Sequence, residues 1–279
     1  MGVVAEIENT LGRLREKESV RGDPVLRTST MTHLVWAPLT WLPQARRTLA
    51  GLRDRHPART ILLVPEPGRE GRVTAKASLH GVQVDGGREA FAEVIEIRLR
   101  GEAGAHPASI VLPLLISDLP VFCRWRGEPD WTSSQLRELV SVADRLVVNS
   151  SEWRGLPEGY VPLAELFDRI VVSDIAFSRT LGWRLRLAQL WPAIGSVERI
   201  RVEGPQAEAL LLAGWLRSRL RREVELSTRV ARELRALWVD GRRVARPENE
   251  VPSGSDLLSA ELDVFSRDRI YEAAAKAAT

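Results

Sequence analysis

Several residue types on which enzymes and metal proteins rely are scarce in this sequence. It contains one cysteine, Cys123, so no internal disulfide can form, and we expect this residue to be a small buried hydrophobe. The 4 histidines are scattered singly, which is not typical of a metal site. No run of about 18 apolar residues occurs, so we expect no membrane-spanning helix.

The sequence motifs of common enzyme classes are missing as well. No lysine follows a glycine, which excludes a Walker A phosphate loop. No G-x-G-x-x-G follows the first predicted strand, and neither H-E-x-x-H nor G-x-S-x-G occurs. We therefore expect no catalytic site, no resident metal and no cofactor, and the sequence favours a protein that binds a partner.

Lysine is almost absent, and arginine supplies nearly all of the positive charge. Lysine occurs only at Lys17, Lys76 and Lys276, and the formal net charge is +3. Arginine stacks on aromatic rings and binds carboxylates or phosphates through two parallel hydrogen bonds. A net charge this small does not argue for a nucleic-acid partner. The first residues include acids and lack the apolar stretch of a signal peptide. We therefore expect no secretory signal and a cytoplasmic location.

The order of apolar segments in the first half predicts an α/β fold. Residues 1–18 have apolar side chains at helical spacing, and a strand (30–38), a helix and a second strand (60–65) read as a βαβ unit with a parallel strand pair. A helix is also expected at 135–143. Further strands are expected at 72–79, 93–99, 120–125 and 144–150.

The second half changes character after a turn-rich stretch at 151–162. Helical sequence dominates from 163 to 191, followed by strands at 197–202 and 223–227 around a helix that starts near Pro205. Residues 232–244 predict a hairpin turning at Asp240-Gly241. The tail contains EAAAK, a helix-forming pentapeptide.

We therefore predict two domains. Residues 1–192 form a larger Rossmann-like domain with a mixed or parallel sheet, flanking helices and a helical connector at about 163–191. Residues 193–279 form a smaller C-terminal α/β domain with a terminal helix.

Arginines and aromatic residues are interleaved between 174 and 191. On a continuous helix, one apolar face would gather Phe177, Leu181, Ala188 and Trp191, widened by Ala176, Trp183, Leu187 and Leu190. Arg179 and Trp183 are four residues apart, which predicts a cation–π contact of ~0.5–2 kcal/mol. Arg184 projects into the apolar face. It either pairs with an internal acid or reaches an anionic ligand or a partner's acid.

A second cluster, Arg124-Trp125-Arg126, comes directly after a predicted strand. If this strand is parallel to its neighbours, these side chains lie at the mouth of the crevice where open α/β sheets bind ligands. Trp125 either caps the core at the strand end or contributes to binding, and both interpretations stay open. The flanking acids Asp118, Glu128 and Asp130 show no spacing that selects acid–base catalysis.

Two of these segments, in order, resemble the OpcA family of glucose-6-phosphate dehydrogenase assembly proteins. The first is PLLISDLPVFCRWRGEP (113–129), followed by ADRLVVNSSEW (143–153), and the second is DIAFSRTLGWRLRLAQLW (174–191). Phe177 stands where the family pattern has tryptophan. The matching positions are Pro113, Leu114, Leu115, Asp118, Pro120 and Trp125, then Asp174, Ile175, Phe177, Arg179, Trp183 and Arg184.

The resemblance implies a non-catalytic protein that binds glucose-6-phosphate dehydrogenase and supports NADPH production in the oxidative pentose phosphate pathway. The alternative is a sugar-phosphate-binding enzyme or sensor that uses arginine clamps. Cyanobacterial relatives are associated with redox control through cysteines, but a chain with Cys123 alone cannot carry an internal disulfide switch. The candidate partner- or ligand-binding residues are Arg124, Trp125, Arg126, Asp174, Arg179, Trp183 and Arg184.

Overall fold

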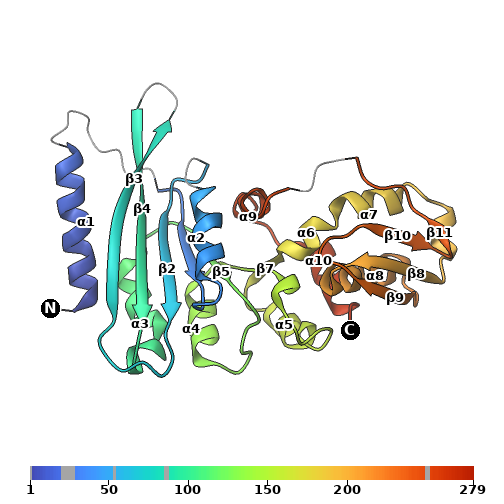
Figure 1. Cartoon of the computed structure of the whole chain (residues 1–279), viewed down its shortest axis with the longest axis horizontal. Helices are drawn as coiled ribbons and strands as arrows, with labels where there is room; N and C mark the ends of the chain where they lie inside the picture. Colours follow the sequence, from blue (N-terminus) through green and yellow to red (C-terminus); the bar gives the residue numbers. More distant parts are fainter. Residues whose placement is uncertain (1, 20–28, 53–54, 85–87, 249–251) are drawn as a thin grey trace. The chain divides into compact units, whose positions relative to one another are not determined.

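The structure, a computed structural model, describes residues 2–19, 29–52, 55–84, 88–248 and 252–279 (Figure 1). The chain divides into two compact units. The first comprises Met1–Val147 with Gly254–Asp263, and the second Val148–Ser253 with Val264–Thr279. This division by compactness follows a different line from the predicted domains 1–192 and 193–279, which stay a prediction.

The first unit is built on a mostly parallel sheet, as the sequence predicts. It holds six strands of the larger, seven-stranded sheet, in the order β3-β4-β2-β1-β5-β6. β1 lies between β2 and β5 and is parallel to both, while β3 and β4 form an antiparallel pair. The bounds are β1 Thr32–Trp36, β2 Arg59–Pro65, β3 Thr74–Val84, β4 Arg88–Leu99, β5 Val121–Trp125 and β6 Arg145–Val148.

Helices cover this sheet and bury its apolar side chains. α2 packs Leu42 and Ala45 against Val35 of β1 and Leu62 of β2, and α1 lies along β3 (Figure 1). None of the helices in the described part of the chain is long and apolar enough to cross a lipid bilayer. The helices of this unit are α1 Val3–Ser19, α2 Leu42–Ala50, η1 Glu102–Gly104, α3 Pro107–Val111, η2 Leu112–Leu114, α4 Ser134–Val142 and α9 Gly254–Leu262.

The second unit contains a four-stranded sheet in the order β11-β10-β8-β9. β8 and β9 are parallel. The predicted hairpin is confirmed, because β10 and β11 pair antiparallel, and Asp240 and Gly241 between them have φ angles of 46° and 82°. The elements of this unit are η3 Ser150–Glu152, α5 Tyr160–Leu166, β7 Val171–Asp174, α6 Ile175–Arg179, α7 Leu181–Ala188, η4 Ala193–Ser196, β8 Arg199–Gly204, α8 Gln206–Leu220, β9 Glu225–Val230, β10 Ala236–Val239, β11 Arg242–Arg243 and α10 Arg269–Lys276.

Helices dominate residues 163–191, as predicted, but they do not form one helical segment. A strand, β7, interrupts it, and Thr180 separates α6 from α7. Val171 and Val172 favour extended structure because their β-branched side chains pack well in sheets. Asp174 then starts a new helix, since its side chain accepts a hydrogen bond from the backbone N–H of Ala176 at 2.8 Å. At this segment, burial of the valine side chains in a sheet therefore outweighs the helical propensity of the surrounding sequence.

The C-terminal EAAAK segment is part of the second unit's core. It forms α10, whose Tyr271, Ala274 and Ala275 are buried, and α10 packs against α8. The two helices approach closely at Gly214, where a Cβ atom would collide with the carbonyl oxygen of Ala274.

We expect Gly214→Ala to destabilise the protein. Forcing α8 and α10 apart costs about 1–3 kcal/mol, as is typical when atoms are added to a packed contact. Urea unfolding measures the change, and Gly12→Ala is the matched control. No atom lies within 4 Å of the added Cβ at Gly12, so that change is expected to be neutral or stabilising by up to about 1 kcal/mol. Equal unfolding midpoints for the two variants would contradict the packing argument.

Candidate functional site

A cleft opens at the carboxyl ends of the central strands of the first unit. Trp36 ends β1 and Trp125 ends β5, and the two residues are paired in the parallel register. Their rings stack with centroids 4.8 Å apart and an interplanar angle of 17°. The chain runs from β1 to β2 on one side and returns to β5 on the other, so this is the topological switch point where open α/β sheets bind ligands.

The cleft has the volume of a small-molecule site. It encloses about 980 Å³, and both stacked tryptophans line it together with Glu128 and Asp130. Ligand sites in proteins usually span about 300–1,000 Å³. Besides the two rings, the lining carries four acids, Glu66, Glu70, Glu128 and Asp130, together with Arg69.

Glu66, the first residue after β2, lines the same cleft but is committed to the fold. It accepts hydrogen bonds from Arg100 Nε at 2.6 Å and from Arg98 Nη1 at 2.5 Å. These hydrogen bonds hold the pKa of the Glu66 carboxyl below its usual value. Glu66 therefore stays ionised at neutral pH and anchors the strand ends, which is not the behaviour of a general acid.

The condition attached to the Arg124-Trp125-Arg126 cluster is met, because β5 is parallel to β1 and β6. Trp125 reaches the cleft. The other two side chains are buried within the first unit. Arg124 Nη1 donates hydrogen bonds to the carbonyl oxygen of Trp125 and, at 3.4 Å, to that of Val147. The Arg126 guanidinium lies 5.2 Å from the centre of the Trp41 ring.

Asp174, in the second unit, is a buried structural anchor. Its Oδ1 accepts hydrogen bonds from the backbone N–H groups of Ser150, at 3.0 Å, and Ala176, at 2.8 Å. One carboxylate thereby fixes the start of α6 against the turn after β6.

Arg179 extends from α6 towards a buried acid. Its Nη1 lies 3.4 Å from Glu208 Oε1 and 3.4 Å from Ser151 Oγ, which itself donates to Glu208 Oε1 at 3.0 Å. Burial raises the pKa of Glu208, and the charge of Arg179 opposes that shift. Arg179 therefore compensates an internal carboxylate.

The expected contact between Arg179 and Trp183 is replaced by another one. Arg184 lies with its guanidinium 3.8 Å from the centre of the Phe177 ring, and its Nε donates to Thr180 Oγ1 at 3.0 Å. Burial lowers the pKa of Arg184 to about 10, and Asp268 acts in the opposite direction. This guanidinium is held over an internal ring and within electrostatic range of Asp268, so the geometry favours an arginine that is satisfied inside the chain. Contact with a partner stays a prediction.

The helix projection also misplaced part of the apolar face. Phe177, Trp183 and Leu187 are buried as expected, but Leu181 and Trp191 are exposed. The break at Thr180 changes the phase between α6 and α7, so a single projection cannot describe both. The sequence did contain a sign of these exposed side chains: α7 is apolar on more than one side, which is unusual for a helix that only covers a core.

These exposed side chains form a feature that sequence reasoning missed. We call Leu181 and Leu185 of α7, together with Trp191 in the turn that follows this helix, the α7 ridge. Their exposed fractions are 52%, 53% and 69%. Leu181 and Leu185 are four residues apart on α7 and therefore share a face. Exposed large apolar side chains that gather in one segment are typical of protein contact surfaces.

The described residues offer little for catalysis by thiol or metal. Cys123 is buried, as predicted, and burial raises the pKa of its thiol to about 12. It is therefore protonated and unreactive at neutral pH. Among the described residues, no group of three or more His, Cys, Asp or Glu side chains could hold a metal ion.

Two family models match the chain, one in each half. Residues 50–166 match the N-terminal domain of a glucose-6-phosphate dehydrogenase subunit, and residues 170–252 match its C-terminal domain, both from OpcA models. Together the matches cover most of the chain.

Two cyanobacterial proteins described as "Putative OxPP cycle protein OpcA" are also similar. The protein of Nostoc punctiforme is 26% identical over 178 residues, which is 60% of this chain and 38% of that protein. The protein of Synechocystis is 26% identical over 138 residues, which is 46% of this chain and 29% of that protein. The matched region therefore spans well under half the length of these relatives.

A solved structure, described as a putative oxidoreductase from Magnetospirillum magnetotacticum, covers 90% of this chain and 99% of its own, with a TM-score of 0.47 and 12% identity. Similarity at this level says nothing about function.

We expect the stability of the protein to fall as pH rises from about 4.5, the usual pKa of a glutamate, through the raised pKa of Glu208. The unfolded chain releases the proton first, so each step upward in this window favours unfolding. Glu208→Gln is expected to flatten this part of the curve of unfolding free energy against pH. Glu198→Gln, at an exposed position, is the control and should leave it unchanged. Parallel curves for all three proteins would rule out the assignment.

Proposed function

Because the chain belongs to the OpcA family of glucose-6-phosphate dehydrogenase assembly proteins, we propose that it is a non-catalytic assembly factor or allosteric activator that binds this dehydrogenase. It acts in the cytoplasm and supports NADPH production in the oxidative pentose phosphate pathway. The two relatives described as OxPP cycle proteins support the same pathway.

The observation that carries this proposal is the α7 ridge. It lies within the region that matches the C-terminal family model, and it exposes two leucines and a tryptophan to solvent. Apolar side chains of this size are costly to leave in water, and tryptophan is enriched among the residues that dominate binding energy in protein interfaces. The dehydrogenase is the occupant we propose for this surface.

The candidate arginines already make contacts inside the protein. Arg124, Arg126, Arg179 and Arg184 are engaged with carbonyls, rings or an acid inside their own units. We propose that they hold the surfaces in place, so that binding energy comes from apolar contact. Direct contact between the candidate residues and a partner stays a prediction.

Activation follows from unequal affinity for two states of the dehydrogenase. A protein that binds the assembled, active form more tightly shifts the population towards it by the difference in binding free energy. A tenfold shift requires about 1.4 kcal/mol. That amount is supplied if the active form of the dehydrogenase buries one or two leucine-sized side chains of this protein that the inactive form leaves exposed to solvent.

A sugar-phosphate-binding enzyme or sensor is the second candidate. The cleft over Trp36 and Trp125 favours it, because its volume of about 980 Å³ suits a small molecule. The lining acids outnumber Arg69 and weigh against an anionic ligand. A thermal-shift screen with sugar phosphates separates the two functions, since a tight ligand raises the melting temperature.

We expect Leu185→Asp to weaken binding to the cognate dehydrogenase by about tenfold or more, because a charge replaces a buried apolar contact. Isothermal titration measures the affinity, and NADPH formation by the mixture reports the activation. The melting temperature should stay unchanged, since Leu185 is half exposed in the isolated chain.

The control is Val161→Asp, which introduces the same charge at a helical position with a similar exposed fraction of 55%. Equal binding by the two variants would remove the α7 ridge from the proposal. If the unmodified protein changes neither the rate, the substrate affinity nor the oligomeric state of the dehydrogenase, the proposed function itself fails.

A further inference from the structure

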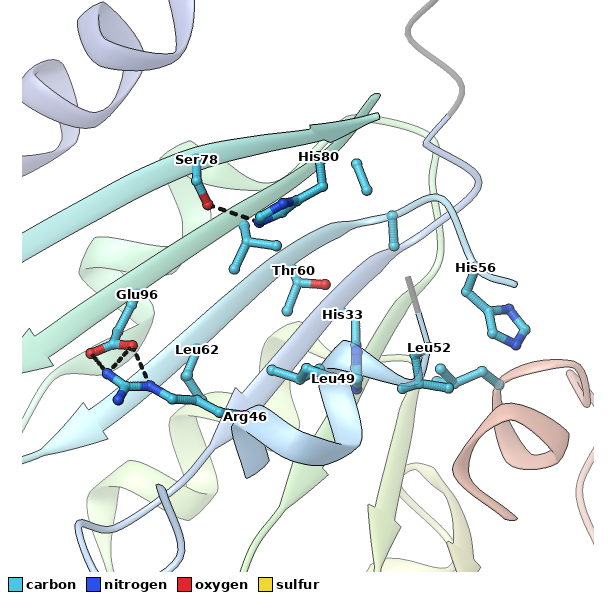
Figure 2. A pocket seen from close by; sticks show the side chains of 14 residues that line it. His33, Arg46, Leu49, Leu52, His56, Thr60, Leu62, Ser78, His80 and Glu96 are labelled. Atoms are coloured by element: carbon cyan, nitrogen blue, oxygen red, sulfur yellow. Dashed lines mark hydrogen bonds and ion pairs between the residues drawn. The ribbon is translucent and has the colours of Figure 1, made fainter. Parts of the chain in front are cut away.

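A second cavity lies on the α2-facing side of the sheet, away from the strand ends that form the cleft. It encloses about 320 Å³, and we call it the His33 cavity. Side chains of α2 and of α9 form its walls, and side chains of four strands form its floor. Figure 2 shows these side chains converging on one space from β1, β2, β3 and β4.

The floor includes polar side chains from neighbouring strands. His33 of β1 is paired with Thr60 of β2, Thr60 with Val94 of β4, and Val94 with Ser78 of β3. Two residues further along β1 and β2, the same face carries Val35 and Leu62 against α2. A sheet face that only packs against a helix needs no polar side chains, because buried polar groups cost stability unless they are paired.

His33 is the most informative of these side chains. It is 2% exposed, and its Nε2 atom has no hydrogen-bond partner among the described residues. Burial, with His56 and Arg124 nearby, lowers the pKa of His33 to about 3. The ring is therefore neutral at pH 7, so Nε2 either donates or accepts one hydrogen bond, depending on the tautomer. The ring nitrogen therefore leaves one hydrogen bond that an occupant of the cavity can complete.

The charges that line the cavity are already balanced. Arg46 donates to both carboxylate oxygens of Glu96, at 2.7 Å each. The other two lining histidines have hydroxyl partners. His56 Nε2 lies 2.7 Å from Ser259 Oγ, and His80 Nε2 lies 3.2 Å from Ser78 Oγ (Figure 2 shows the latter contact).

The remaining walls are aliphatic, with Leu49 from α2, Leu52 two residues after its end, and Leu262 from α9. A charged ligand would therefore enter without a counter-charge, whereas a neutral molecule with an apolar face finds a matching environment.

We propose that the His33 cavity binds a small uncharged heterocycle that carries hydrogen-bond donors and acceptors on one edge, as a nucleobase or nicotinamide does. The polar edge lies against His33 and Thr60, which are neighbours in the β1–β2 register, and the ring faces Leu49 and Leu52. The cavity lies between the sheet and α2, and a planar ring can pack one face against each of them. This site goes beyond the proposed function and does not depend on it.

The test is binding of three probes, adenine, uracil and nicotinamide, to the full chain. Saturation-transfer NMR detects binding, and titration gives the dissociation constant, expected at about 1 mM or below for at least one probe. Thr60→Val keeps the shape of the side chain and removes its hydroxyl, so it is expected to weaken binding about tenfold. His106→Gln is the control, because that side chain is 60% exposed and does not line the cavity.

A second variant fills the space. Ala92 is buried and lines the cavity from β4, so Ala92→Leu is expected to abolish probe binding while the melting temperature holds or rises. No saturation transfer from any of the three probes at about 10 mM, a concentration well above the expected dissociation constant, would overturn the proposal. Binding that is equally strong in the unmodified protein, Thr60→Val and Ala92→Leu would overturn it as well.

Discussion

The position of β1 between two parallel neighbours is the constraint on which the first unit depends. Its register with β5 places Trp36 beside Trp125, and their stacked rings line the cleft at the carboxyl ends of the strands. Its register with β2 places His33 beside Thr60, on the face that α2 covers. Because side chains alternate along a strand, one five-residue strand supplies both sites, on different faces of the same sheet. A slip of one residue would exchange the two faces and abolish both sites.

Arginine is used mainly inside the fold. Arg124 donates to backbone carbonyls, Arg184 lies over Phe177, and Arg179 offsets the charge of Glu208. Each guanidinium replaces water around a buried polar group or ring, so little of its charge is left for recognition. The exposed apolar side chains of the α7 ridge then become the feature that a partner can use. The same short helix buries Trp183 and Leu187 on its inner side, which couples this surface to the core of the second unit.

Local sequence patterns predicted the elements that have strong local causes. The alternation of strand and helix in the first half gave the parallel strands, and Asp240-Gly241 gave the hairpin, because both residues tolerate positive φ. The patterns failed at β7, where two valines next to a helix-forming stretch became a strand. They failed again in the projection of 174–191, since the phase of a helix is lost once Thr180 breaks it.

By itself, the sequence determined the α/β class, the absence of an internal disulfide and the family, because composition and ordered motifs require no knowledge of contacts. Only the tertiary structure decided which side chains of each motif are exposed to solvent. Trp125 ends β5 and Trp191 lies in the turn after α7, yet Trp125 is stacked and buried while Trp191 is 69% exposed. The His33 cavity is likewise invisible in sequence, since strand register alone brings residues 33, 60 and 78 into one row. Burial and register depend on elements distant in the chain, and no local pattern encodes them.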